Sequence, residues 1–339
     1  MDETVFALEF SGWKRPFVRL CFPNSSVRFV RDPAKVPAGS ALAIWGRRVP
    51  DDLAAGIRVF RIEDGFLRSV GLGSDLVRPL SWVVDDQGIY YDATRPSRLE
   101  SILANMEPDA GLSERAAALC ERIVASQLTK YNVGNANWQS PSAASRVVLV
   151  PGQVESDTSL AFGAPDVRRN IDLLRAVRIA RPDAHVVYKP HPDVLAGMRR
   201  AGTGEEEARH WCDEVVGNVP MDCLLEHAHE VHVMTSLSGF EALLRGKEVI
   251  CHGLPFYAGW GLTHDLVQCP RRERNLTLDQ LVAGALIRYP VYFDREGKRR
   301  ITPEAALDLL AEWSAERGGR EPWWRGTARI ILRRVVGVR

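Results

Sequence analysis

Short hydrophobic runs alternate with helical patterns through the second half of the chain. Apolar residues spaced three and four apart predict helices over 170–179, 221–227 and 238–245, and Gly246 is a typical stop for the last of these. The runs between the helices are rich in Val and Ile, as buried strands are. The alternation predicts a parallel sheet covered on both faces. The strands are expected at 147–150, 184–189, 231–234 and 249–251, with a further helix at 276–289.

The first half shows a second, less regular α/β pattern. Apolar runs predict strands at 41–45 and 59–62, and helical spacing covers residues 97–130. Two further runs, 83–84 and 89–91, flank a polar turn and predict a β-hairpin. The chain is therefore expected to hold two α/β lobes.

A polar segment without apolar periodicity, 131–145, is expected to join the lobes. The domains predicted from this are an N-terminal lobe, 1–140, a C-terminal lobe, 146–310, and a basic tail, 311–339. The tail carries adjacent tryptophans, Trp323 and Trp324, among several arginines. Such a segment can lie on an anionic membrane surface, and the alternative is a closing helix that packs on the body.

Composition excludes some classes of function but does not identify one. A length of 339 residues suits two domains, and the formal net charge of +1 gives no field that favours nucleic acid. The six cysteines have no CxxC spacing, which fits a reducing compartment, and a loose Cys/His cluster lacks the spacing of structural zinc sites. With no signal peptide and no membrane span expected, the chain is predicted to be cytoplasmic. The charge and the cysteine spacing predict neither nucleic-acid binding nor a structural zinc site.

Polar side chains follow three of the predicted strands in the second half. The carboxyl ends of parallel strands share one edge of a sheet, where ligands of α/β proteins bind. A lysine, a histidine and the hydroxyls at a helix start are groups that hold phosphate, although one serine there also reads as a plain helix cap. The residues expected at this edge are Asp157, Lys189, His191, Thr235, Ser236 and Ser238, of which Ser238 is the expected cap.

Two adjacent carboxylates, Glu63 and Asp64, end a predicted strand of the first half. A close carboxylate pair is typical of general acid or base chemistry. The alternative is a solvated acidic turn. The sequence has neither the GxGxxG dinucleotide fingerprint nor a Walker loop.

Taken together, the carboxylate pair with Gly65, the His191-Pro192 step and the later Ser/Thr cluster resemble the motifs of CMP-sugar transferases. Longer strings resemble the KpsC-type capsule polysaccharide β-Kdo transferases, over roughly residues 55–300. KpsC-type proteins carry two such modules in tandem, whereas this sequence has one and adds the basic tail. The strings that carry the resemblance are residues 63–73, 88–92, 188–194, 239–246 and 253–261.

The resemblance implies a GT-B-like α/β fold, in which two Rossmann-like lobes have a cleft between them. It implies a retaining β-Kdo transferase that uses CMP-Kdo as donor and needs neither cofactor nor metal. Retention admits a double displacement by a carboxylate. The implied partners are a Kdo-terminated or lipid-linked acceptor, capsule assembly proteins and the inner face of the cytoplasmic membrane. The alternatives are another donor, such as CMP-sialic acid or a UDP-sugar, and a non-catalytic scaffold of capsule assembly.

The resemblance also implies roles for individual residues. Asp157 is the candidate nucleophile and Glu155 the second choice, while Asp64, with Glu63 beside it, is the candidate base. The other implied contacts are Lys189 and His191 at the departing phosphate, Thr235, Ser236, Ser238 and Gly239 around the same phosphate, and Arg68 at the carboxylate of Kdo.

Overall fold

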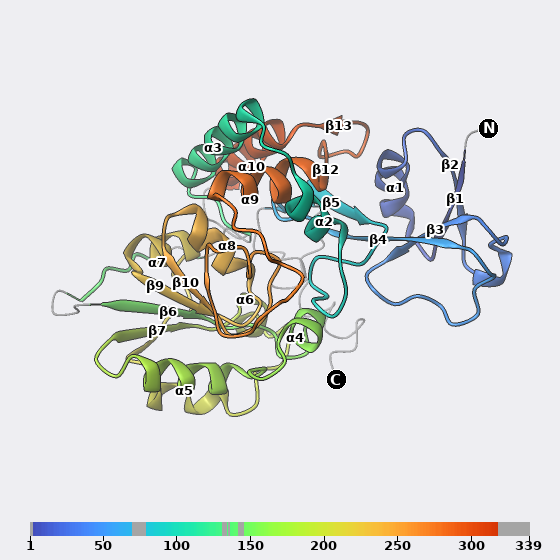
Figure 1. Cartoon of the computed structure of the whole chain (residues 1–339). Coiled ribbons are helices and arrows are strands. Elements are labelled where there is room, and N and C mark those ends of the chain that lie inside the picture. The colour runs from blue at the N-terminus through green and yellow to red at the C-terminus, as the bar shows by residue number, and fades with distance from the viewer. Residues whose placement is uncertain (1–2, 70–78, 131–133, 135, 142–145, 318–339) are drawn as a thin grey trace. The chain divides into compact units, whose positions relative to one another are not determined.

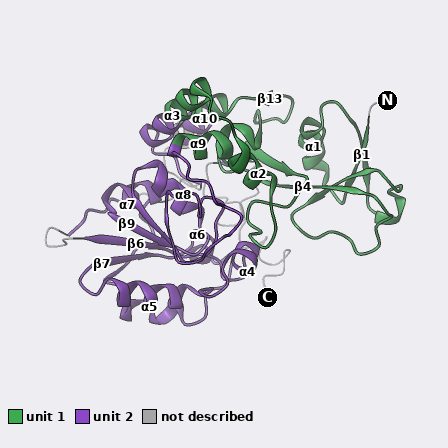
Figure 2. Cartoon of the chain, in the orientation of Figure 1, with its two compact units in different colours: residues 1–68, 79–119, 279–308 green, residues 69–78, 120–278, 309–339 purple. Residues whose placement is uncertain are grey.

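The structure is a computed structural model that describes residues 3–69, 79–130, 134, 136–141 and 146–317. The chain divides into two compact units, each built on its own sheet (Figure 2). Unit 1 comprises 1–68, 79–119 and 279–308, and unit 2 comprises 69–78, 120–278 and 309–339. The expected α/β fold is therefore confirmed for both halves.

Unit 1 contains a mixed sheet of seven strands in the order β13-β12-β5-β4-β3-β1-β2. Its first four strands in the chain are parallel, and the other three are antiparallel to their neighbours. The predicted strands at 41–45 and 59–62 are confirmed. The strands are β1 (Thr4–Leu8), β2 (Ser26–Val30), β3 (Ala41–Trp45), β4 (Arg58–Asp64), β5 (Ser81–Asp85), β12 (Pro290–Phe293) and β13 (Arg300–Ile301).

Aromatic rings fill the core beneath this sheet. Trp82 on β5 is buried, and its ring centroid lies 5.3 Å from Phe17, 5.1 Å from Trp45 and 5.7 Å from Phe293. The helical pattern over 97–130 forms two helices instead of one. The helices assigned wholly or partly to unit 1 are η1 (Gly12–Lys14), α1 (Arg15–Cys21), η2 (Pro33–Lys35), α2 (Arg98–Asn105), α3 (Ala110–Ala125), α9 (Leu278–Val282), η5 (Ala283–Arg288) and α10 (Pro303–Arg317).

The predicted β-hairpin is wrong in its second strand. Residues 81–85 form β5, but 89–91 are not a strand. The cause is Asp85, whose carboxylate accepts the N–H groups of Gly88 at 2.8 Å and Arg98 at 2.9 Å, so that the chain turns away from the sheet. β5 pairs instead with β4 and β12.

Unit 2 contains the predicted parallel sheet, with six strands in the order β11-β10-β9-β6-β7-β8. The order runs outward from β6 in both directions, as in Rossmann-like sheets, and it reverses between β6 and β9. All four predicted strands are confirmed. The strands are β6 (Val147–Pro151), β7 (His185–Lys189), β8 (Glu214–Val215), β9 (Glu230–Val233), β10 (Glu248–Cys251) and β11 (His264–Asp265).

Helices cover both faces of this sheet. Figure 1 shows α5 on one side of the strands and α7 and α8 on the other. Val148, Val150 and Val186 pack with Leu173 and Leu174 of α5 in a buried apolar core. The helices of unit 2 are α4 (Thr158–Gly163), α5 (Asn170–Ala180), α6 (Pro192–Leu195), η4 (Glu205–His210), α7 (Met221–His227) and α8 (Leu237–Leu244).

The division of the chain differs from the predicted lobes at the C-terminal side. Residues 279–308 belong to unit 1, because β12 pairs with β5 and Phe293 enters the core around Trp82. Much of the predicted linker and residues 318–339 of the predicted tail lie outside the described residues, whereas 311–317 continue α10.

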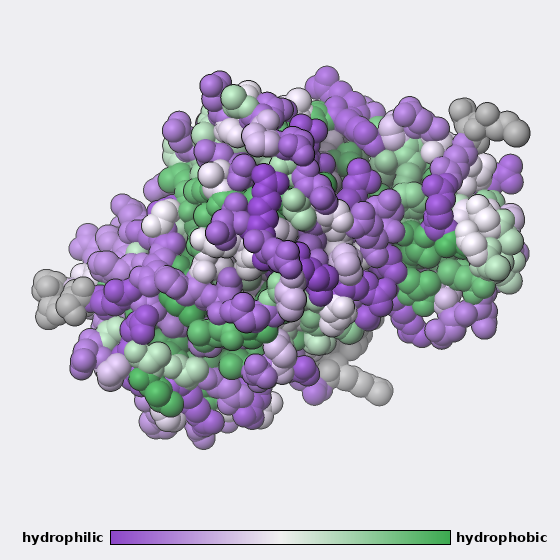
Figure 3. Space-filling view, viewed as in Figure 1, coloured by the Kyte–Doolittle hydropathy of each residue, from purple (hydrophilic) through white to green (hydrophobic). Residues whose placement is uncertain are grey.

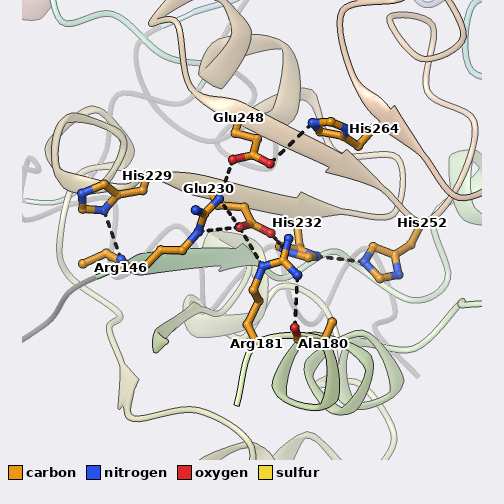
Figure 4. A network of polar contacts seen from close by, with 10 residues as sticks. Arg146, Ala180, Arg181, His229, Glu230, His232, Glu248, His252 and His264 are labelled. Carbon is orange, nitrogen blue, oxygen red and sulfur yellow. Dashed lines mark hydrogen bonds and ion pairs between the residues drawn. The ribbon is translucent and has the colours of Figure 1, made fainter. Parts of the chain in front are cut away.

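A charged network joins the amino-terminal ends of the strands in unit 2 (Figure 4). Glu230 begins β9 and is fully buried. Its carboxylate accepts from Arg146 at 2.8 Å, Arg181 at 3.0 Å and His232 at 2.5 Å, and the second nitrogen of His232 lies 3.0 Å from His252. From the amino-terminal ends of the strands the network runs along β9 to His252, which follows β10 and donates its backbone N–H to Val233, the last residue of β9.

All six cysteines lie in the described residues and are free thiols. In the part of the chain that the structure describes, no helix has the length and apolar character needed to cross a bilayer, and no cluster of His, Cys, Asp and Glu is suited to hold a metal. On the face seen in Figure 3, hydrophilic residues predominate, and hydrophobic residues also reach the surface around β1 and β3.

Candidate functional site

The loops after β6 and β9 meet at the point where the strand order of unit 2 reverses. Gln153 links them, because its side chain accepts the Thr235 N–H at 2.9 Å and donates to the Thr235 hydroxyl at 3.0 Å. The Thr235 hydroxyl also contacts that of Ser159 at 3.1 Å. Thr235 therefore lies at the predicted edge beside the loop that carries Asp157.

Gln153 was missed by the sequence analysis. Its backbone is clamped by the side chain of Asn170, which accepts the Gln153 N–H and donates to the Gln153 carbonyl, both at 2.9 Å. The available signal was a polar residue two positions after a buried strand, which would have identified Gln153 but not its contact with Thr235.

The start of α8 lies at the same edge, and its helix dipole favours an anion there. Ser236 is the N-cap, and its hydroxyl accepts the Ser238 N–H at 3.2 Å. The expectation that Ser238 is the cap is therefore wrong by two residues. Gly239 is required for packing, because a Cβ there would lie 2.2 Å from the hydroxyl of Tyr257, which donates to the Ser236 carbonyl.

His191 caps α6, and this fixes its proton. Its Nδ1 accepts the Asp193 N–H at 3.1 Å, so a neutral ring carries its hydrogen on Nε2 and can donate it to a ligand. Burial lowers the pKa of His191 to about 4, against the opposing effect of the Asp193 and Asp157 carboxylates. At neutral pH the side chain is therefore an uncharged donor within electrostatic reach of Asp157.

The two candidate nucleophiles differ in their surroundings. Asp157 is exposed and caps α4, with one carboxylate oxygen accepting the Ser159 N–H at 2.8 Å. Both oxygens of Glu155 accept backbone N–H groups, from Asn170 at 2.9 Å and Thr203 at 3.0 Å. Glu155 is thus engaged in fixing its loop, and the geometry favours Asp157.

Lys189 is 4% exposed, and its ammonium group is bound within the protein. It donates to the carbonyl of Gly217 at 3.2 Å and to that of Val219 at 2.5 Å. Burial lowers its pKa to about 8, opposed by the carboxylate of Asp222. In this arrangement Lys189 stabilises the loop at 217–219, and its contact with a phosphate stays a prediction.

In unit 1, Glu63 and Asp64 are consecutive residues of β4, so their side chains leave the sheet on opposite faces. Both carboxylates nevertheless act electrostatically on the same ammonium, that of Lys14, and the carboxylate pair stays a prediction. Asp64 accepts from Arg68 at 2.7 Å, and Glu63 turns back to accept the Asp64 N–H at 3.1 Å. Arg68, the predicted contact for a Kdo carboxylate, is thus already paired with Asp64.

Comparison with known proteins supports a family assignment. The sequence profile of the family described as capsule polysaccharide biosynthesis protein matches residues 41–135 and 108–292. The chain is 44% identical to the capsule polysaccharide modification protein LipA of Neisseria meningitidis serogroup B, over 90% of this chain and 45% of LipA. It is 41% identical to the lipopolysaccharide-processing protein LpsZ of Rhizobium meliloti, over 83% of this chain and 68% of LpsZ. The chain thus spans about half the length of LipA.

Two solved structures from Thermosulfurimonas dismutans share the fold. One is described as KpsC, beta Kdo 2,7 transferase, with 36% identity, a TM-score of 0.75, and coverage of 91% of this chain and 99% of that one. The other, KpsC, beta Kdo 2,4 transferase, has 32% identity, a TM-score of 0.79, and coverage of 90% and 97%. The resemblance to KpsC-type transferases is therefore confirmed, and the chain belongs to the capsule polysaccharide biosynthesis protein family.

Proposed function

We propose that the chain is a glycosyltransferase that moves Kdo from CMP-Kdo to a saccharide or glycolipid acceptor in capsule or surface polysaccharide biosynthesis. The main support is local: Asp157, His191 and the start of α8 all lie at the carboxyl edge of the parallel sheet in unit 2. The two KpsC structures, each described as a β-Kdo transferase, support the choice of sugar. A GT-B-like division of labour is part of the proposal, with the donor bound by unit 2 and the acceptor by unit 1.

The phosphate of the donor is assigned to the start of α8 and to His191. The helix dipole favours an anion at this start, and Ser236 and Ser238 supply hydroxyls there. The Nε2–H of neutral His191 adds a hydrogen bond that strengthens as charge grows on the departing phosphate. Because a nearby phosphate favours the protonated ring, we expect the lowered pKa of His191 to rise when CMP binds.

Transfer with retention is assigned to two displacements at the anomeric carbon of Kdo. In the first, a carboxylate oxygen of Asp157 bonds to this carbon while the bond to the phosphate oxygen breaks, and CMP leaves with the electron pair. In the second, an acceptor hydroxyl bonds to the carbon, its proton passes to a base, and the Asp157 carboxylate leaves. Two inversions restore the original configuration. Asp64 is the proposed base, and its ion pair with Arg68 at 2.7 Å orients its carboxylate.

Further parts of the proposal concern the setting of the reaction. No metal is assigned to the donor phosphate, and the test is full transfer in excess chelator. The basic tail is proposed to hold the protein at the inner face of the cytoplasmic membrane beside other capsule assembly proteins. Binding to anionic liposomes that falls with added salt is the expected result for the tail.

The deciding experiment is incubation with CMP-Kdo, generated in situ, and a Kdo-terminated acceptor, followed by NMR of the product. A new β-Kdo linkage is the expected result. The α-anomer would overturn the retaining mechanism, and the absence of transfer would overturn the activity. Thermal shifts with CMP, UDP and GDP provide the control for donor class, because only CMP is expected to stabilise the protein.

A further inference from the structure

The parallel part of the sheet in unit 1 has its own reversal of strand order, between β1 and β3. Ligands of α/β proteins bind outside the carboxyl ends of strands at such a point. The chain leaves β1 there and reaches Trp13 and Lys14 in η1, and β3 ends at Trp45. The candidate base, Asp64, ends β4, which is the next strand beyond β3. These residues share one edge of the sheet.

Trp13 is an exposed ring on a rigid support. Its side chain is 40% exposed. Its ring packs edge-on against Phe17 at 6.3 Å and Trp82 at 6.4 Å between centroids, and Trp45 packs against the same Trp82. Because Phe17 and Trp82 are buried, the outer face of Trp13 is held in place. A fixed aromatic surface costs little entropy when a ligand stacks on it.

Lys14 adds a charge to this surface. Its ammonium lies 2.9 Å from the ring centroid of Trp45 and 5.5 Å from that of Trp13. Among the described residues, Lys14 makes no side-chain hydrogen bond or ion pair. Burial lowers the pKa of Lys14 to about 8, while the carboxylates of Asp64 and Glu63 oppose this shift. A half-buried ammonium with unused donors is unfavourable unless a ligand satisfies it.

We propose that Trp13, Lys14 and Trp45 form a binding site for a carboxylated saccharide, with the sugar ring stacked on Trp13 and its carboxylate bound by the Lys14 ammonium. The inference rests on the proposed function in one respect, since it identifies this saccharide as the terminal sugar of the acceptor. Asp64 acts electrostatically on the Lys14 ammonium, so the candidate base lies near the carboxylate of the bound sugar. A neutral sugar would provide no negative charge to pair with the Lys14 ammonium.

The test measures binding without any donor, by saturation-transfer NMR titration of the full chain with the methyl β-glycoside of Kdo. The methyl ester of the same glycoside is the matched neutral ligand. The wild-type protein is expected to bind the acid roughly tenfold more tightly than the ester. In Lys14→Met this preference disappears, whereas the control Lys35→Met, at an exposed lysine of the same unit, retains it.

The ring is tested in parallel. Trp13→Ala is expected to weaken binding of both ligands by about tenfold, and Trp13→Phe to preserve most of the affinity because a ring remains. Melting temperatures verify that the variants are folded. The inference is overturned if wild type shows no binding, or if folded Lys14→Met still prefers the acid. Binding of the acid with no transfer from CMP-Kdo would overturn the proposed function and leave this site standing.

Discussion

At the scale of single residues, Asp157 and Glu155 show how hydrogen bonds separate two carboxylates of one loop. Asp157 keeps one oxygen outside its cap interaction, whereas both oxygens of Glu155 are held by backbone N–H groups. Asp157→Asn should therefore lower transfer by about 10³-fold or more, because an amide is a poor nucleophile. The thermal shift with CMP should persist, since Asn caps a helix as well as Asp does.

The matched variant is Glu155→Gln. Its amide keeps one acceptor oxygen and replaces the other by a donor that faces the Thr203 N–H or the Asn170 N–H. We expect a lower melting temperature with the catalytic rate of the folded fraction largely retained. Full activity in Asp157→Asn, with transfer abolished in folded Glu155→Gln, would reverse the assignment.

Lys189 allows a second prediction at this scale. Lys189→Met removes the hydrogen bonds to the carbonyls of Gly217 and Val219 and leaves both oxygens without this partner. The free energy of unfolding should fall by about 1–3 kcal/mol in denaturant titration. The affinity for CMP, measured by calorimetry, should change little. A large loss of CMP affinity at unchanged stability would instead show that Lys189 reaches the phosphate.

Sequence patterns identified the residue types at this edge but not their hydrogen-bond partners. Residues at carboxyl ends of parallel strands are brought together by topology, which the hydrophobic runs do predict. The partners of Lys189 lie in a loop about 30 residues further along the chain, and no local pattern specifies them. The ion pair of Asp64 with Arg68 was likewise not predicted, because hydrophobic patterns do not specify how charged side chains pair.

At the scale of elements, the position of α8 depends on Gly239. Gly239→Ala places a Cβ 2.2 Å from the Tyr257 hydroxyl and 2.8 Å from Cζ of the same ring, and this buried ring cannot move aside easily. Either the ring or the start of α8 must shift, so we expect a loss of about 1–3 kcal/mol in stability and weaker CMP binding. Denaturant titration and calorimetry measure the two effects.

Gly111→Ala is the control for this prediction. Gly111 lies near the start of α3, where a Cβ would meet only a side-chain oxygen of Asp109 at 3.7 Å. Alanine is the better helix former, so stability should stay the same or rise slightly. If Gly239→Ala were as well tolerated as Gly111→Ala, the packing of Tyr257 against α8 would not hold the phosphate site in place.

Helices and strands with a clear hydrophobic pattern were predicted correctly. Segments whose path depends on side-chain hydrogen bonds were not. β6 is a continuous apolar run and β7 contributes Val186 and Tyr188 to the core, as expected of strands buried on both faces. The false hairpin had equally apolar runs, but the carboxylate of Asp85 redirected the chain. The break between α2 and α3 coincides with Pro108, which the helical spacing alone did not reveal.

At the scale of the whole molecule, the network around Glu230 should control stability at acid pH. Burial alone would raise the pKa of Glu230, but hydrogen bonds from His232, Arg181 and Arg146 outweigh it and lower the pKa to about 2. A carboxylate with a lowered pKa stabilises the fold above its unfolded pKa of about 4.5, and this contribution is lost as the pH falls toward 2. Glu230→Gln should flatten the pH dependence of stability in this window.

The same variant should be less stable at neutral pH, by about 1–3 kcal/mol, because the hydrogen bonds from Arg146 and Arg181 to a charged acceptor are lost. Denaturant titrations at several pH values provide both measurements. If stability fell with acid pH as steeply in this variant as in wild type, the Glu230 network would not contribute to the pH dependence of stability.

His252 governs a higher pH window. Burial lowers the pKa of His252 to about 4, with a smaller effect from His232 in the same direction, so the folded protein holds the ring neutral. Above the unfolded pKa of about 6.5 the ring is neutral in both states and its burial has no charge penalty. As the pH falls toward 4, the unfolded chain takes up a proton that the folded protein does not, so the free energy of unfolding decreases. His252→Asn should reduce the fall in stability across this range, part of which remains because His191 titrates there too. An unchanged slope would contradict the assignment.

Strands β12 and β13 follow unit 2 in the sequence but belong to the sheet of unit 1. This limits how chimeric proteins can be built from relatives. A fragment that ends at residue 140 would lack the strand that covers β5 and would remove Phe293 from the side of Trp82. The bare edge would then be a template for aggregation. A chimera that exchanges the first unit between relatives must therefore also carry residues 279–308 from the same parent, so the single crossover point that the linear order suggests is not enough.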